Sequence, residues 1–271
     1  MQENVFYEAQ KDNNTSLYRI TDGNGTNFLH FHRAMEISYV LSGSVTFYLE
    51  DKVFTASKDD IIFVDSYLKH KAIPIENYNA HILGFPTVIS DEISAIFKGR
   101  TLPYLLDDKE FNAKFLPIIE TLVKEGDKKN DVIIRGYTSA LFGEFALHYK
   151  TEKIKPKSKS VSLVQDILEY IDAHFCEPIT LEDLSARFGY TPSYFSRTFN
   201  QYIGIPLKTY LNFIRYSKYK EELKNNPQKS KTQIIFDCGF ASLPTFYRVE
   251  KSLENATKTS QAHGNSTYVP C

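Results

Sequence analysis

Four side chains in the first third of the chain have the types and the spacing of a divalent-metal site. His30 and His32 are two residues apart, Glu36 follows four residues later, and His70 lies further along. Side chains on a β-strand alternate between two faces, so His30 and His32 would share one face. Imidazole and carboxylate groups are ligands that suit Zn²⁺, Mn²⁺ or Fe²⁺. The same groups can instead hydrogen-bond a small ligand or each other.

A second informative pattern is an internal repeat, in which residues 184–199 resemble residues 234–250. Each copy predicts a short helix, a turn at Gly189 or Gly239, and a second helix. Glycine suits this turn because it adopts the left-handed conformation that ends many helices. Two such copies are typical of paired helix-turn-helix units.

The second helix of each unit carries polar side chains opposite its apolar face. Arginine can donate two parallel hydrogen bonds to guanine, and the other polar groups suit phosphates or base edges. For the arginines, contact with phosphate alone is the alternative. The predicted DNA-binding residues are Ser193, Ser196, Arg197 and Asn200 in the first unit and Thr245, Tyr247, Arg248 and Lys251 in the second.

A long helix is predicted between the two units, from Pro206 to Leu223. A helix of about 18 residues is roughly 27 Å long. A spacer of that length could hold two recognition helices near the ~34 Å repeat of one DNA turn. Both helices would then enter successive segments of the major groove.

Residues 161–260 resemble the AraC/XylS family of transcription regulators, with Gly204, Pro206 and Arg215 at matching positions between the two units. The resemblance implies promoter binding, usually as a dimer that responds to a small molecule, and contact with RNA polymerase in an activator. The second unit departs from the family pattern, for example at Glu250, where phenylalanine is usual. We therefore expect the second unit to bind the DNA backbone more than the base sequence.

Residues 28–84 are rich in β-branched and aromatic residues separated by turn signals, which predicts the short strands of a sandwich or barrel. The HxHxxxE pattern with a distant histidine resembles the metal motif of cupins. Sensor domains of AraC-type regulators commonly keep such a barrel without metal chemistry, so no cofactor is expected and a metal on the four residues named first is the alternative. The predicted effector-binding residues are His30, His32, Glu36, Tyr39 and His70.

The predicted fold is α+β and multidomain: a cupin-like β-barrel and a helical hairpin, followed by an all-α domain with two helix-turn-helix motifs joined by a long helix. The hairpin is a candidate for dimerisation, or it simply covers the barrel. The expected boundaries are 1–105 for the ligand-sensing barrel, 106–150 for the hairpin, 151–160 for a linker, 161–262 for the DNA-binding domain and 263–271 for a loose tail.

Composition and charge narrow the class of protein. Three scattered cysteines in 271 residues argue against a disulfide framework or a zinc finger and favour a reducing compartment. No apolar run approaches the ~18 residues of a membrane span, and no signal sequence is apparent. Residues 1–150 hold 16 basic and 21 acidic side chains, whereas residues 151–271 hold 16 and 12. The basic half suits a phosphate-rich partner.

Together these patterns predict a cytoplasmic, nucleoid-associated regulator rather than an enzyme. It would bind double-stranded promoter DNA in a sequence-specific manner as a homodimer, without a membrane partner, and respond to a small-molecule effector. The alternative is a metal-dependent cupin enzyme with an accessory helical domain. The paired helix-turn-helix units argue against this alternative, since an enzyme has no need of them.

Overall fold

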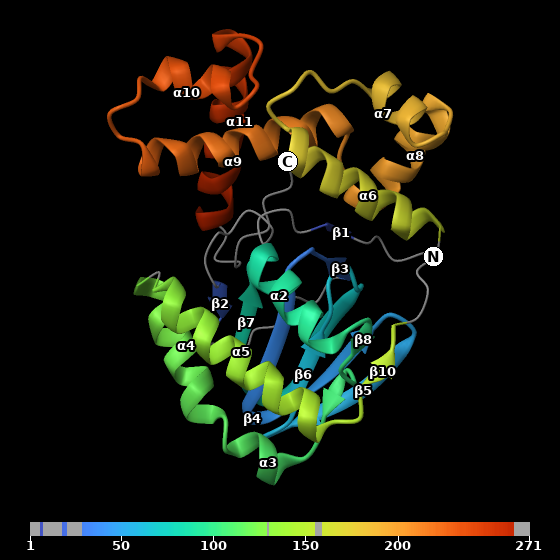
Figure 1. Ribbon diagram of the computed structural model, residues 1–271, viewed down its shortest axis with the longest axis vertical. Helices are drawn as coiled ribbons and strands as arrows, with labels where there is room; N and C mark the ends of the chain where they lie inside the picture. Colours follow the sequence, from blue (N-terminus) through green and yellow to red (C-terminus); the bar gives the residue numbers. More distant parts are fainter. Residues whose placement is uncertain (1–5, 8–17, 21–28, 129, 155–158, 263–271) are drawn as a thin grey trace. The chain divides into compact units, whose positions relative to one another are not determined.

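The structure is a computed structural model, and it divides into two units, residues 1–156 and 157–271, which are described separately below (Figure 1). Neither unit contains, within the described ranges, a helix long and apolar enough to cross a membrane. The described residues are 6–7, 18–20, 29–128, 130–154 and 159–262.

The first unit is built on an eight-stranded sheet with the strand order β1-β3-β7-β4-β6-β9, in which β2 also pairs with β7 and β5 with β4. The described strands form no ladder between the first and the last strand of that order, so the expected barrel is a curled, open sheet (Figure 1). The strands are β1 (Phe6–Tyr7), β2 (Tyr18–Ile20), β3 (His30–Phe31), β4 (Met35–Leu49), β5 (Lys52–Ser57), β6 (Ile61–Val64), β7 (His70–Phe85) and β9 (Leu105–Leu106).

The two longest strands, β4 and β7, pair antiparallel along their whole length with shifts in register between Val40 and Val45. Such bulges bend a strand and increase its twist. Gly43 lies at this point with a φ of +67°, and a Cβ atom there would be 1.9 Å from the carbonyl oxygen of Glu76. Because no side chain fits, glycine at this position lets β4 bend closely against β7.

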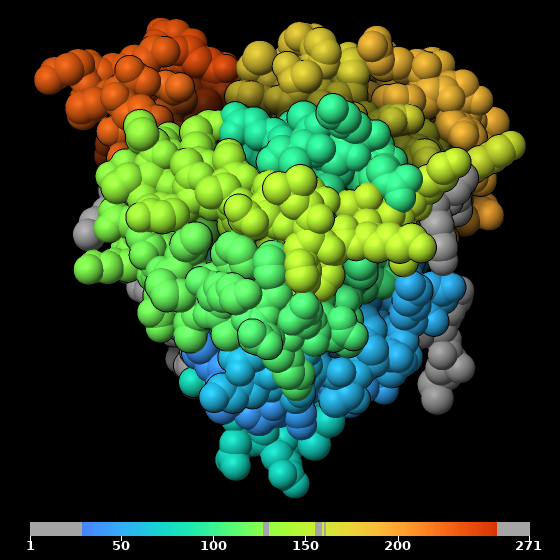
Figure 2. All heavy atoms as spheres, turned by 60° about the horizontal axis from the view of Figure 1, so that its bottom comes forward, coloured from blue at the N-terminus to red at the C-terminus, as the bar shows by residue number. Residues whose placement is uncertain are grey.

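Three helices cover one face of the sheet: α2 (Thr87–Phe97), α4 (Leu116–Lys128) and α5 (Asp131–His148). Figure 2 shows this helical layer in green and yellow-green, in front of the blue strands. The helical hairpin thus uses its apolar side to cover the sheet. The shared core includes Met35, Ile37, Leu83 and Phe85 from the sheet and Ile93, Ile119, Leu122, Leu141, Phe142 and Phe145 from the helices.

Several expected boundaries in this region were wrong. Helix α2 was not predicted, and the first hairpin helix is two helices, because Asp108 caps a separate short helix, α3 (Lys109–Ala113). Helix α4 runs through Gly126 to Lys128. The expected linker 151–160 begins with a strand, β10 (Glu152–Lys153), that pairs with β8 (Arg100–Thr101).

The second unit is helical and has the predicted order of elements. Its last helix, α11, extends to Ala262. The predicted tail 263–271 lies outside the described residues. The helices are α6 (Lys159–His174), α7 (Leu181–Arg187), α8 (Pro192–Ile203), α9 (Leu207–Asn225), α10 (Lys231–Asp237) and α11 (Leu243–Ala262).

The close approach at Gly43 generates a stability prediction. We expect Gly43→Ala to lower the free energy of unfolding of the first unit by about 2–4 kcal/mol, because the new methyl group meets backbone and the positive φ is unfavourable. Hydrogen exchange of peptides from β4 and β7 measures this loss locally. Gly136→Ala in α5, where an added Cβ has open space, is the control and should be neutral or stabilising by up to about 1 kcal/mol. Equal exchange in both variants would refute the constraint at Gly43.

Candidate functional site

The first helix-turn-helix unit consists of α7 and α8, and local signals set both of its helix starts. Thr180 caps α7 by accepting a hydrogen bond from the backbone N–H of Asp183. The turn contains Gly189 at φ +74°. Thr191 then caps α8 by accepting from the backbone N–H of Tyr194, and Pro192 occupies the first helical position, where a missing N–H costs little. The orientation of α8 therefore follows from the sequence of this turn.

The polar face of α8 is available to a partner. Ser193, Arg197 and Asn200 are exposed and Ser196 is half-buried, while the apolar side of the helix is buried. The prediction omitted Tyr194, which is 41% exposed on the first turn of α8. Its ring stacks on Tyr190 with centroids 5.1 Å apart. Tyr190 itself is half-buried.

The second helix-turn-helix unit consists of α10 and α11 and repeats this geometry with one difference. Tyr247, Arg248 and Lys251 are exposed on α11. Thr245 is turned toward the helix start, where its hydroxyl lies 3.0 Å from that of Ser242. Ser242 in turn accepts a hydrogen bond from the backbone N–H of Thr245. Three of the four predicted residues thus share an exposed face, and Thr245 takes part in capping.

The departure from the family pattern at Glu250 does not bury an isolated charge. Glu250 is only half-buried, so part of its carboxylate is reached by water. Its charge adds to the effect of burial in raising the pKa of Tyr219 on α9. Phe246 and Phe240 fill the core beside it, with ring centroids 5.2 Å apart. The second helix-turn-helix unit therefore keeps an apolar core.

Helix α9 connects the two helix-turn-helix units, and Arg215 fixes its position. The Arg215 Nε–H and one terminal N–H donate to the carbonyl oxygens of Phe175 and Glu177, both at 2.7 Å. Burial lowers the pKa of this guanidinium, but the pKa of arginine lies so far above neutral pH that the group stays charged. Gly239 packs against the same segment, since a Cβ there would be 2.7 Å from the Cα of Cys176. Residues 175–177 thus hold α9 and the second helix-turn-helix unit together.

The three histidines that the sequence singled out are adjacent in the first unit. His30 on β3 pairs directly with His70 on β7, and their ring centroids are 4.1 Å apart. The ring centroid of His32 is 4.9 Å from that of His70. One potential ligand nitrogen from each ring lies within 4.8 Å of the others. All three side chains are buried.

Glu36 completes this cluster, because its Oε2 lies 3.5 Å from the Nε2 of His32 and the residue is buried. The ring of Phe47 stacks on His70 with centroids 5.9 Å apart. Tyr78 was not among the predicted site residues, but burial and the charge of Glu36 raise the pKa of its hydroxyl. Three adjacent imidazoles, with a carboxylate next to one of them, fit the donor set of a divalent metal ion.

Tyr39 does not join the cluster, contrary to the expectation. It lies three residues after Glu36 on β4, and an odd separation places it on the opposite face of the strand. Its ring packs in the core beneath the helices. Its hydroxyl donates a 2.7 Å hydrogen bond to Asp59, and burial, followed by this bond, raises its pKa. Tyr39 is a structural residue of the helix-covered face.

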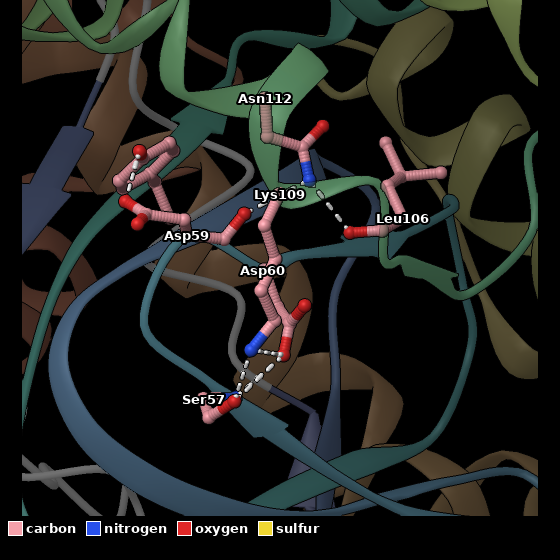
Figure 3. A network of polar contacts seen from close by, with 7 residues as sticks. Ser57, Asp59, Asp60, Leu106, Lys109 and Asn112 are labelled. Carbon is pink, nitrogen blue, oxygen red and sulfur yellow. Dashed lines mark hydrogen bonds and ion pairs between the residues drawn. The ribbon is translucent and has the colours of Figure 1, made fainter.

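Figure 3 shows the polar network that Tyr39 enters through the turn between β5 and β6. The Asn112 Nδ2 donates to the carbonyl oxygens of Asp59, at 3.0 Å, and Leu106, at 2.8 Å. The carboxylate of Asp60 lies 3.6 Å from the Lys109 Nζ. These contacts fasten α3 to the sheet, and each has an evident structural role.

The contacts of Arg215 generate a second prediction. Arg215→Lys should lower the free energy of unfolding of residues 157–271 by about 1–3 kcal/mol, because an ammonium group does not reproduce the two parallel hydrogen bonds of the guanidinium. Far-UV circular dichroism during urea titration follows the loss of helix. Lys220→Arg, an exposed substitution on the same helix, is the matched control and should leave the midpoint unchanged. An unchanged midpoint for Arg215→Lys would show that these two hydrogen bonds do not hold the unit together.

Comparisons with known proteins agree with this arrangement. A family model described as an AraC-like ligand binding domain matches residues 15–142, and one described as a helix-turn-helix domain matches residues 184–258. An uncharacterized HTH-type transcriptional regulator of Escherichia coli K12, YdiP, is 25% identical over 238 residues, which are 81% of this chain and 76% of that protein.

Two further similarities are less extensive or more distant. An uncharacterized HTH-type transcriptional regulator of Staphylococcus aureus strain MSSA476 is 30% identical over 94 residues, which are 35% of this chain and 12% of that protein. The crystal structure of an apo ToxT variant from Vibrio cholerae is 15% identical, covers 89% of this chain and 94% of its own, and has a TM-score of 0.46. With an AraC-like ligand binding domain followed by a helix-turn-helix domain in one chain, the protein belongs to the AraC family of transcription regulators.

Proposed function

We propose that the protein binds promoter DNA in a sequence-specific manner through α8 and α11, and that an effector in the first unit modulates this binding. The observation that carries the proposal is the matching register of two exposed helix faces. Arg197 and Arg248 each lie five residues after the first residue of their helix. Asn200 and Lys251 each lie three residues further, and all four side chains are exposed. Two equivalent faces suit two equivalent grooves.

The length of α9 supports binding to successive segments of the major groove. Its 19 residues correspond to roughly 28 Å of helix. One turn of B-DNA is ~34 Å, so a spacer of this length is of the required order. Arg215 anchors the middle of α9, which makes it a rigid spacer.

The two helix-turn-helix units differ in the hydrogen-bonding side chains that they present to base edges. Ser193 stands on the first turn of α8, whereas Leu243 and Pro244 occupy the first turn of α11 and offer no side-chain hydrogen bonds. Thr245 is engaged in capping. We therefore assign most of the base discrimination to α8 and more of the phosphate contact to α11, in keeping with the positive charge of Lys251.

The remaining parts of the proposal concern assembly and place of action. The protein would act as a homodimer at promoters in the bacterial cytoplasm, associated with the nucleoid, and would contact RNA polymerase if it is an activator. The outer side of α5 supports self-association, since Val132 is 81% and Leu147 is 85% exposed there. No catalytic role is proposed for the first unit.

The role of Arg197 can be tested on DNA sites selected from a random library with the full-length protein. Arg197→Ala should raise the Kd for the selected site by about 5- to 150-fold, equivalent to ~1–3 kcal/mol, and relax the preference at one or two base pairs. Fluorescence anisotropy measures both effects. Lys124→Ala, an exposed substitution on α4, should leave the Kd unchanged. An unaltered Kd for Arg197→Ala would remove this residue from the interface.

Substitution of Lys251 tests the proposed difference between the two helix-turn-helix units. Lys251→Ala should weaken binding to all sequences by a similar factor and reduce the slope of log K against log salt by about 1, because a phosphate contact releases roughly one counterion. Base substitutions across the two half-sites should cost more under α8 than under α11. Equal costs in both halves would contradict the assignment of base discrimination to α8.

A further inference from the structure

We infer that the effector of the first unit is a divalent transition-metal ion, held by His30, His32, His70 and Glu36. The regulatory part of this inference rests on the proposed function, whereas ion binding can be measured without DNA.

The positions of the ligand atoms are close to those that a metal ion requires. The three nitrogen donors already lie within 4.8 Å of one another. Tetrahedral coordination with metal–nitrogen distances near 2.0–2.1 Å places such donors about 3.3 Å apart. Side-chain movements of roughly 1 Å would therefore close the site. His30 and His70 need no backbone change to approach, because they are directly opposed on neighbouring strands.

Backbone contacts place two of the rings in the form that binds metal. The Nδ1 atoms of His32 and His70 lie 2.8 Å and 2.9 Å from the carbonyl oxygens of Ala34 and Leu68. A carbonyl oxygen only accepts, so each Nδ1 carries a proton, and in the neutral ring Nε2 keeps its lone pair. Metal-bound histidines usually have their second nitrogen held in this way. The Nε2 of His32 faces the Glu36 carboxylate at 3.5 Å.

The charge of the site favours a cation over an anionic organic effector. Glu36 is a buried carboxylate, and a buried charge is costly without compensation. A divalent ion is attracted by this carboxylate, whereas a carboxylate or phosphate ligand would be repelled by it.

The burial of the ligands gives the ion a structural rather than a catalytic character. All four residues are at most 4% exposed, and closed sites are typical of metals that stabilise structure. Glu36 pairs with Gly84 at one end of the β4–β7 ladder, and His70 pairs with Leu49 at the other. A bound ion would connect residues from the two ends of this ladder and so stabilise the curl of the sheet.

Metal binding is tested with the full-length protein after treatment with a chelator. Titration with Zn²⁺ and Co²⁺, followed by calorimetry and by the visible absorption of Co²⁺, should show one ion per chain and a rise in Tm. Glu36→Gln and His32→Gln should weaken the ion by at least 10-fold and abolish the rise in Tm. His174→Gln, on α6 in the other unit, should bind as the wild type does. Circular dichroism confirms that each variant is folded.

The outcomes separate this inference from the proposed function. Absence of stoichiometric binding, or equal affinity in Glu36→Gln and His174→Gln, overturns the metal site while leaving Arg197-dependent DNA binding intact. Stoichiometric binding with a DNA affinity that differs at least fivefold between the chelated and the loaded protein supports the metal as effector. Stoichiometric binding with identical DNA affinity in both states overturns its role as effector. Failure to select any DNA site overturns the proposed function but leaves the binding titration valid.

Discussion

The DNA-binding unit depends on one short segment, residues 175–177, where the chain leaves α6. Arg215 donates two hydrogen bonds to carbonyl oxygens of this segment, and Gly239 packs against its backbone from the second helix-turn-helix unit. These contacts join the segment after α6 to α9 and to the turn of the second helix-turn-helix unit. The junction therefore fixes where α9 and the second unit lie relative to the end of α6.

In the first unit the corresponding constraint is the bend of β4 on β7. The space at Gly43 admits no side chain, and the register shifts around it turn a long ladder into a curl. The curl brings His32, which lies just before β4, beside His70 at the start of β7, and Glu36 on β4 lies next to His32. The helices cover the other face, so the buried cluster and the main helix-packed core are separated by the sheet. A change in ligation at the cluster would act on the strands themselves.

The parts predicted from sequence are those with local physical signals. The internal repeat and its two turn glycines, which both have positive φ, predicted both helix-turn-helix units, and the HxHxxxE spacing predicted the histidine cluster. Tyr39 was misassigned because the two-residue period of a strand was applied to the histidines but not carried on to it. Helix α2 was missed although Ile89, Ile93 and Phe97 recur at helical spacing. The pairing of β10 with β8 is a long-range contact that no local pattern encodes.

The ladder between β4 and β7 also bears on how the chain acquires its structure. It joins residues 35–49 to residues 70–85, so the sheet must close long loops before its hydrogen bonds form. The second unit is held mainly by helices close together in the sequence, and such local topologies fold faster. During synthesis the first unit emerges earlier, yet its core is complete only once α5 has left the ribosome, because α5 supplies Leu141, Phe142 and Phe145. The slowly folding sheet is therefore the part of the chain most exposed to aggregation before the helical layer covers it.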